Sequence, residues 1–265
     1  MFLLWFFVDT AQATTYTDSD GDAMTKIAIC IPTLGPPSWR LFDSFGAWQV
    51  RHCLMHPGIN VDIIRPPREL PVDVARNMLA AEALKGDFDW LWFTDQDAAY
   101  LPETLDRLLA WNEDIVGAMC MVRGSDEVRP MVYQGRNPED TAWRIPIDEV
   151  YEFFRMHANR RTNEPQLLDP IPRDSLLKVN FTGCHCLLIR RIVLEKMQPP
   201  WFKGDPGTED RYFHLKAALL GFQPYVDMST IVGHAVGSKL IGVRDFMANY
   251  VFELAMATEE ANNGE

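Results

Sequence analysis

The chain has 265 residues, of which 47% are hydrophobic and 23% charged, and its formal net charge is −12. This composition is ordinary for a globular protein with one large α/β domain or two small ones. The acidic balance argues against a nucleic-acid polymer as the main partner, because phosphate backbones are bound through clustered Lys and Arg. A small anionic ligand is still compatible, since carboxylates can hold a divalent cation that offsets phosphate charge.

Five cysteines, an odd number, leave at least one thiol unpaired and favour a reducing, cytoplasmic location. Residues 1–23 are interpreted as a disordered or non-native leader, ahead of a single domain over 24–265. The apolar run Phe2–Val8 lacks a basic flank and is far shorter than the roughly 20 residues of a membrane span, so a signal peptide is the less favoured alternative. Asp18–Asp22 looks like the start of a calcium loop without its closing Glu and is interpreted as linker.

Apolar runs that suit strands buried on both faces alternate with helix-like segments along the chain. In chain order we predict strand Lys26–Ile31, helix Trp39–Met55, strand Val61–Ile64, helix Val72–Leu84, strand Trp90–Thr94, helix Pro102–Trp111, strand Ile115–Met121, a strand pair or interrupted strand over Leu176–Arg190, helix Ile192–Met197, helix Arg211–Leu220, strand Gln223–Val226 and helix Arg244–Ala261. This order predicts an α/β fold with a mostly parallel central sheet flanked by helices. Its ligand site is expected at the carboxyl ends of the strands.

Residues 123–175 lose this regularity, apart from a helix-like patch at Glu149–His157, and are interpreted as a variable insertion or lid. Loops over a fixed scaffold commonly carry specificity, so we expect this region to influence substrate choice. Residues 238–265 are expected to form a C-terminal helix, and its Phe246–Met256 segment is apolar enough to contact a membrane surface or a partner subunit.

Two carboxylates follow the predicted strand Trp90–Thr94 directly. Asp95 and Asp97 are two residues apart, so they project to the same side where a sheet presents its ligands. Mg²⁺ and Mn²⁺ are held by such oxygen ligands together with substrate phosphates. The alternative is an Asp-rich loop that only caps the next helix. The wholly apolar strand before the pair favours the metal site.

A second acidic pair, Glu209 and Asp210, follows Gly207 and Thr208 at the start of the predicted helix Arg211–Leu220. A carboxylate at a helix N-terminus is biased toward its ionised form, as a general base must be. The alternative is a plain cap made by Thr208 and acidic residues of the first turn.

Three further features could be functional or structural, depending on the residues that surround them in the fold. His234 ends an apolar stretch, and neutral imidazole is a good Mn²⁺ ligand beside carboxylates. Arg76 offers a planar donor fork suited to pyrophosphate, or else pairs with Asp73 or Glu82 on its own helix. Cys184-His185-Cys186 has neither the spacing nor the second ligand pair of a zinc site, so buried thiols are expected there.

In this order and spacing, the motifs resemble the GT-A glycosyltransferases, in particular the family 2-like enzymes of bacteria and phages. The resemblance covers about Thr25 to Gly237. It rests on motifs that lie in the family's order: Ile27–Thr33, Ala75-Arg76-Asn77, Phe93–Asp97, Thr182–Cys184, Leu188–Arg191, Thr208-Glu209-Asp210 and Gly233-His234.

The resemblance implies a role for each of these positions. Pro32 and Thr33 would border the nucleoside, Arg76 would face it or its phosphates, and Gly183 would let backbone approach the sugar. Asp95 and Asp97 would hold Mn²⁺ or Mg²⁺ and the donor diphosphate, with His234 completing the metal site. Glu209 and Asp210 would lie near the acceptor, where Asp210 would be the base of an inverting enzyme.

The chain departs from the family after the second strand, where Ile64–Glu69 replaces the common Asp-Asp-Gly-Ser segment and leaves Asp73 as the substitute nucleoside contact. The expected reaction moves a sugar from a UDP- or GDP-sugar to a hydroxyl acceptor, with a retaining course and a homo-oligomer left open. A nucleotidyltransferase is less favoured, because Leu34–Pro37 is not a glycine-rich basic phosphate loop. A non-catalytic nucleotide- or carbohydrate-binding module is the other alternative, and the presence of both Asp97 and Asp210 counts against it.

Overall fold

The structure, a computed structural model, describes residues 25–32, 59–64, 66, 70–123, 127–135, 145–157, 175–204 and 208–248. The leader 1–23, the predicted helix Trp39–Met55 and the end of the predicted closing helix lie outside the described residues. Residues 243–248, at the start of that closing helix, are helical.

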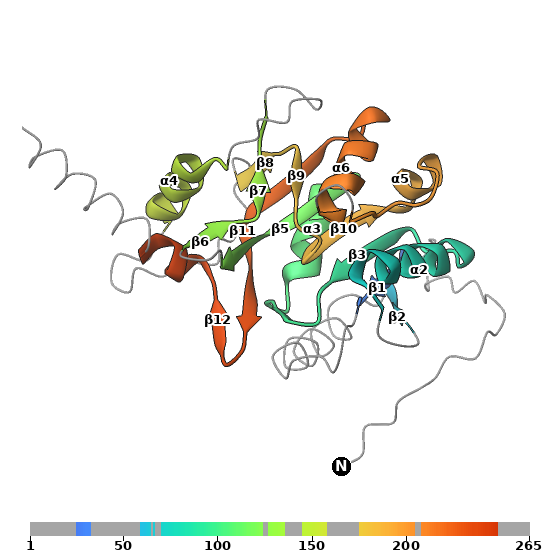
Figure 1. The fold of residues 1–265 in the computed structure, drawn as a ribbon, viewed down its shortest axis with the longest axis horizontal. Coiled ribbons are helices and arrows are strands. Elements are labelled where there is room, and N and C mark those ends of the chain that lie inside the picture. Colours follow the sequence, from blue (N-terminus) through green and yellow to red (C-terminus); the bar gives the residue numbers. More distant parts are fainter. Residues whose placement is uncertain are drawn as a thin grey trace, which may run out of the picture.

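A mixed sheet of ten strands forms the centre of the described part of the chain (Figure 1). Its main path runs β12 (Lys239–Ile241), β11 (Pro224–Val236), β5 (Ile115–Arg123), β10 (Cys186–Arg190), β3 (Trp90–Thr94), β1 (Thr25–Cys30) and β2 (Ile59–Ile64). The short strands β4 (Ala98–Ala99) and β8 (Leu176–Lys178) pair with β11, and β6 (Val128–Pro130) pairs with β5. A separate two-stranded sheet joins β7 (Val132–Tyr133) to β9 (Phe181–Thr182).

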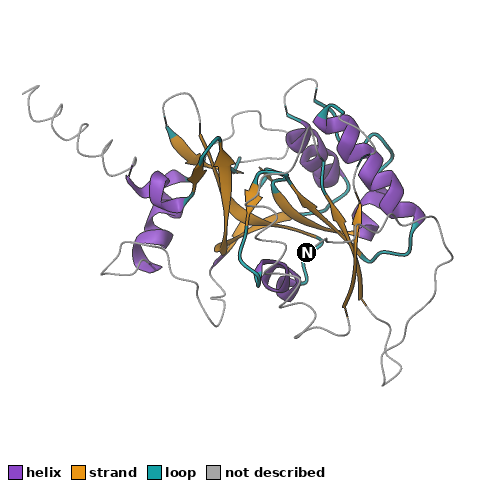
Figure 2. Cartoon of the chain, turned by 90° about the horizontal axis from the view of Figure 1, so that it is seen from below, coloured by secondary structure: helices purple, strands orange, loops and turns teal. Residues whose placement is uncertain are grey.

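Helices cover both faces of this sheet (Figure 2). Those that the structure bounds are α2 (Val72–Lys85), α3 (Thr104–Trp111), α4 (Ile147–His157), α5 (Arg191–Lys196) and α6 (Glu209–Leu219). Buried residues of α2, α5 and α6 share one apolar cluster with Phe93 and Leu187, whereas those of α3 share another with Trp92 and Leu188. Because side chains alternate along a strand, β3 and β10 contribute to both clusters and are buried on both faces.

The prediction of a mostly parallel sheet is wrong. The pairs β1–β2, β1–β3 and β5–β11 are parallel, but β10 lies antiparallel between β3 and β5, and every pairing of the short strands and of β12 is antiparallel. A strand buried on both faces is a continuous apolar run in either direction, so hydrophobicity alone could not reveal the reversal.

Strand β11 is also much longer than the predicted Gln223–Val226. Its pairing with β5 shifts register between Asp227 and Ile231, which marks an irregularity in the strand. The fully buried Asp227 accepts hydrogen bonds there from Ser229 N and Oγ and from Thr230 Oγ1. These polar residues interrupt the hydrophobic pattern, so the sequence indicates only the first part of the strand.

The predicted insertion 123–175 contains β6, β7 and α4 among its described residues. Val150 and Phe154 of α4 pack in one cluster with Met119 and Met121 of β5, so this helix is attached to the central sheet. The role of the region as a variable lid is still a prediction. Among the helices of the described segments, none has the length and apolar character needed to span a bilayer.

Candidate active site

The loop after β3 brings Asp97 to His234. Gly233 and His234 of β11 pair with Ala99 and Ala98 of β4, so His234 lies opposite the residue that follows Asp97. The backbone N–H of Ala235 donates to the Asp97 carbonyl at 2.8 Å and fastens the loop to the strand. The Asp97 Oδ2 atom then lies 3.1 Å from His234 Nε2.

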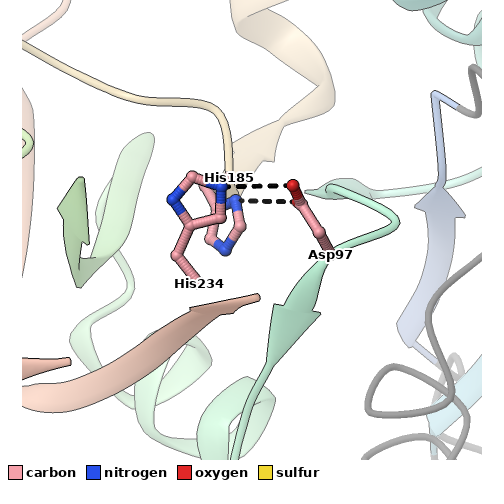
Figure 3. A group of neighbouring side chains, drawn as sticks. All are labelled: Asp97, His185 and His234. Atoms are coloured by element: carbon pink, nitrogen blue, oxygen red, sulfur yellow. Dashed lines mark hydrogen bonds and ion pairs between the residues drawn. The ribbon is translucent and has the colours of Figure 1, made fainter. Parts of the chain in front are cut away.

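The residue before β10 adds a second imidazole. Cys186 pairs with Thr94, and the N–H of Asp95 donates to the His185 carbonyl at 3.1 Å, so His185 lies beside the end of β3. His185 Nδ1 is 3.6 Å from Asp97 Oδ1 and 3.5 Å from Asp95 Oδ2. The two imidazole rings are 4.9 Å apart, and both face the Asp97 carboxylate (Figure 3).

Asp97, His185 and His234 are suited to a divalent cation. One ligand atom from each lies within 4.8 Å of the others. Burial tends to lower the pKa of His185, but Cys120 and Asp95 outweigh that effect and raise it well above its ordinary value. The site therefore favours a positive charge, which a proton or a metal cation can supply. A donor set of one carboxylate and two imidazoles fits Mn²⁺ or Zn²⁺ better than Mg²⁺, which prefers oxygen ligands.

Arg76 of α2 joins the end of β3 to the start of α6. Its side chain is only 2% exposed, and its Nη2 donates to Asp95 Oδ1 at 2.8 Å. Its Nη1 donates to Asp210 Oδ1 at 2.8 Å and also to Glu209. Burial tends to raise the pKa of Asp95, yet Arg76 and then His185 outweigh it and hold that pKa well below its usual range. Asp95 is therefore ionised and already paired.

The acidic pair occupies the first turn of α6, which begins two residues earlier than the predicted helix. The Thr208 hydroxyl accepts from the N–H of Arg211 at 3.4 Å, so Thr208 caps the helix. Burial, followed by the charge of Asp210, raises the pKa of Glu209. The predicted cap is therefore present, and the role of the acidic pair as a general base is still a prediction.

The remaining predicted site residues surround this cluster. Pro32 is buried just beyond β1, on the same sheet edge as Asp95, while Thr33 lies outside the described residues. Asp73 Oδ2 accepts from the N–H of Gly204 at 3.3 Å. A Cβ atom on Gly183 would lie 2.8 Å from Met131 Cε and 3.9 Å from Asp210 Oδ2, so this glycine allows close packing beside the acidic pair.

The sequence interpretation missed His185. Cys184 and Cys186 are buried free thiols, as expected, and burial raises the pKa of Cys186 to about 12. Cys184 packs in the cluster of α2, α5 and α6 and Cys186 in the cluster of α3, whereas His185 lies in the turn before β10, beside Asp95. No local pattern in Cys-His-Cys identifies His185, because its place beside Asp97 depends on the pairing of β10 with β3.

Comparisons with known proteins support a shared fold. No family model matches the sequence, and no curated protein matches it. The crystal structure of A197 from STIV is similar with a TM-score of 0.52 and 18% identity, over 84% of this chain and 92% of that one. A crystal structure of GalNAc-T7 with UDP, GalNAc and Mn²⁺ has a TM-score of 0.43 and 12% identity, over 80% of this chain and 44% of that one. The chain thus shares its fold with A197 and spans under half the length of the GalNAc-T7 chain.

Proposed function

We propose that this chain is a metal-dependent glycosyltransferase of the GT-A type, which moves a sugar from a nucleotide-sugar donor to a hydroxyl acceptor. One observation carries the proposal: Asp95 is paired with His185 of the carboxylate–imidazole group and, through Arg76, is joined to the acidic pair Glu209 and Asp210. The first group is suited to a cation that binds phosphates, and the second to accepting a proton. The transfer of a sugar from a diphosphate to a hydroxyl can use both.

In this proposal Asp97, His185 and His234 hold the cation, and Asp95 lies behind His185 instead of binding the metal directly. Bound Mn²⁺ would supply positive charge against the diphosphate of the donor. His185 and His234 would bind as neutral imidazoles, so metal affinity should fall when they are protonated. Their nitrogen ligands make Mn²⁺ the favoured ion over Mg²⁺.

The acidic pair would act on the acceptor. Asp210 would take the proton of the acceptor hydroxyl while its oxygen bonds to the anomeric carbon and the bond from that carbon to the diphosphate oxygen breaks. The products are the glycoside, the nucleoside diphosphate and a protonated Asp210 that returns its proton to solvent. Attack from the face opposite the leaving group inverts the anomeric centre.

Contacts with the nucleoside are assigned to Pro32, Thr33 and Asp73, and Gly183 would leave room for the sugar beside Asp210. The donor would be a UDP- or GDP-sugar, and the acceptor a hydroxyl compound chosen in part by residues 123–175. Within this proposal the buried location of Arg76 favours a positioning role over a direct contact with phosphate.

A thermal-shift screen tests the proposal. UDP-, GDP-, CMP- and dTDP-sugars are added with and without Mn²⁺ to the wild type, to Asp97→Ala and to Asp87→Ala, an exposed control whose carboxylate pairs with Lys26. We expect one donor to stabilise the wild type and Asp87→Ala in a Mn²⁺-dependent way, with the shift lost in Asp97→Ala. A donor that binds but is never converted with any hydroxyl acceptor would instead identify a nucleotide-binding module.

A further inference from the structure

We infer that Arg76 is a positioning residue that fixes the distance between the donor and acceptor halves of the site. This inference rests on the proposed function. The guanidinium donates from Nη2 to Asp95, which adjoins the cation-binding group, and from Nη1 to Glu209 and Asp210. A single rigid, planar group therefore spans the two sets of residues that must act on one substrate pair.

The burial of Arg76 restricts its role. Its side chain is 2% exposed, and both of its Nη atoms already donate to carboxylates. The three N–H groups that donate to Asp95, Glu209 and Asp210 could reach a phosphate only if one of these carboxylates were displaced, and Nε is buried. Displacing any one of these carboxylates would leave the buried Arg76 guanidinium with fewer negative partners, which is costly in a protein interior. These contacts therefore favour a role for Arg76 in holding the protein carboxylates in place over a role in binding a ligand.

The next residue on α2 reinforces this tie. Asn77 Oδ1 accepts from the N–H of Trp201 at 2.8 Å and from that of Phe202 at 3.2 Å, while Asn77 Nδ2 donates to the Phe202 carbonyl at 2.6 Å. One turn earlier, Asp73 accepts from the N–H of Gly204. Helix α2 thus holds both the segment 201–204, which leads toward α6, and the first turn of α6 itself.

The arrangement has a consequence for kinetics. Lysine can supply the charge of Arg76 but cannot donate in two fixed directions to Asp95 and Asp210 at once. Loss of the fork should therefore let the acidic pair shift relative to the cation-binding group, without removing any group that binds the donor. A misplacement of about 1 Å can lower a rate about a hundredfold. The expected defect lies in kcat, not in donor affinity.

Arg76→Lys is the variant that tests this. Arg190→Lys is the matched control, because Arg190 lies opposite Trp90, at the end of β10 away from the site, and pairs with Asp114. We expect Arg76→Lys to keep the Mn²⁺ and donor affinities within about threefold of wild type while kcat falls about a hundredfold. A donor affinity lowered more than tenfold with kcat retained would overturn the inference.

A double-mutant cycle tests whether Arg76 and Asp210 stabilise the folded protein together, and it needs no transferase assay. Urea unfolding of Arg76→Met, Asp210→Asn and the double variant is measured on the full chain without donor. We expect the unfolding constant of the double variant to depart about tenfold from the product of the single effects. Additivity within about twofold would overturn the inference. If the wild type transfers no sugar, the proposed function fails, whereas this cycle still shows whether Arg76 is coupled to Asp210.

Discussion

Asp97 and His234 are 137 positions apart in the sequence, yet Asp97 Oδ2 lies 3.1 Å from His234 Nε2. The contact is a product of strand pairing, since β4 places Ala98 opposite His234 in β11. Two backbone elements therefore set the geometry of the proposed cation site before any ligand binds, and its affinity can be tested residue by residue.

His185→Ala and His234→Ala should each lower Mn²⁺ affinity by roughly ten- to a hundredfold, because each removes one of three ligands. Isothermal titration with Mn²⁺ measures the effect directly. Asp87→Asn is the control, since its carboxylate is half-exposed and pairs with Lys26 away from the site. Equal Mn²⁺ affinity in His185→Ala and wild type would remove His185 from the metal site.

Added Mn²⁺ should stabilise the folded protein. At a free concentration of 100 times Kd, one site contributes about 2.7 kcal/mol to the free energy of unfolding. Mg²⁺ at the same concentration should give a smaller increase, because imidazole nitrogens are poor Mg²⁺ ligands. Urea unfolding with each ion, and after chelation, measures the difference. A larger effect of Mg²⁺ would contradict the assigned ligand set.

Asp210→Asn should lower kcat by about 10²- to 10⁴-fold, the range expected when a general base is lost. Donor affinity should stay close to that of the wild type, since this carboxylate is assigned to the acceptor side. Glu209→Gln is the informative companion, because both residues pair with Arg76. If the two variants lose activity equally, their shared effect on Arg76, and not base catalysis, explains the loss.

His214 gives a pH dependence that is separate from the cation site. Burial lowers the pKa of His214 from 6.5 to about 4, and its Nδ1–H donates to the Asp210 carbonyl at 2.8 Å. The folded protein keeps this imidazole neutral, so between these two pH values unfolding takes up a proton. The stability linked to His214 is therefore complete above pH 6.5 and is lost as pH falls toward 4, by on the order of 3 kcal/mol.

His214→Asn isolates this effect, because its side-chain amide can donate where Nδ1 does and has no charge to gain. The free energy of unfolding of the variant should fall less between pH 6.5 and 4 than that of the wild type. Parallel pH curves for the two proteins would show that His214 titrates normally in the folded state.

Thr208→Ala should destabilise the protein by about 1 kcal/mol, since it removes the side-chain acceptor at the start of α6. Because Glu209 and Asp210 occupy the first turn of the same helix, its fraying should also lower activity. Thr208→Ser keeps the hydroxyl and is the control, expected to match the wild type in urea unfolding. An unchanged stability in Thr208→Ala would show that this long hydrogen bond contributes little.

Continuous apolar strands were the easiest part of the fold to predict. Trp90–Thr94 was placed at its observed bounds, because an unbroken apolar run leaves little choice of length. The direction of Cys186–Arg190 could not be found in the same way, since burial on both faces hides it. The predicted strand at β11 ends too early because the buried polar residues Asp227, Ser229 and Thr230 look like a loop in the sequence.

The site residues also differ in whether local sequence is enough to predict them. Asp97 was found because it directly follows a buried strand, where local sequence is enough. His185 depends on which strand lies beside β3 and in which direction, so its sequence neighbours Cys184 and Cys186 were misleading. The partners of Arg76 are likewise a tertiary property: the sequence offered Asp73 and Glu82 on the same helix, whereas the carboxylates contacted are Asp95, Glu209 and Asp210.

The most direct test of the central claim is the rate of nucleoside diphosphate release from UDP- and GDP-sugars, with Mn²⁺ and after its removal by EDTA. Wild type, Asp97→Asn and the exposed control Asp87→Asn are compared. The account predicts Mn²⁺-dependent release by the wild type and by Asp87→Asn, abolished by EDTA and lost in Asp97→Asn. Release that persists equally in Asp97→Asn, or no release by the wild type from any donor in the presence of acceptor hydroxyls, would contradict it.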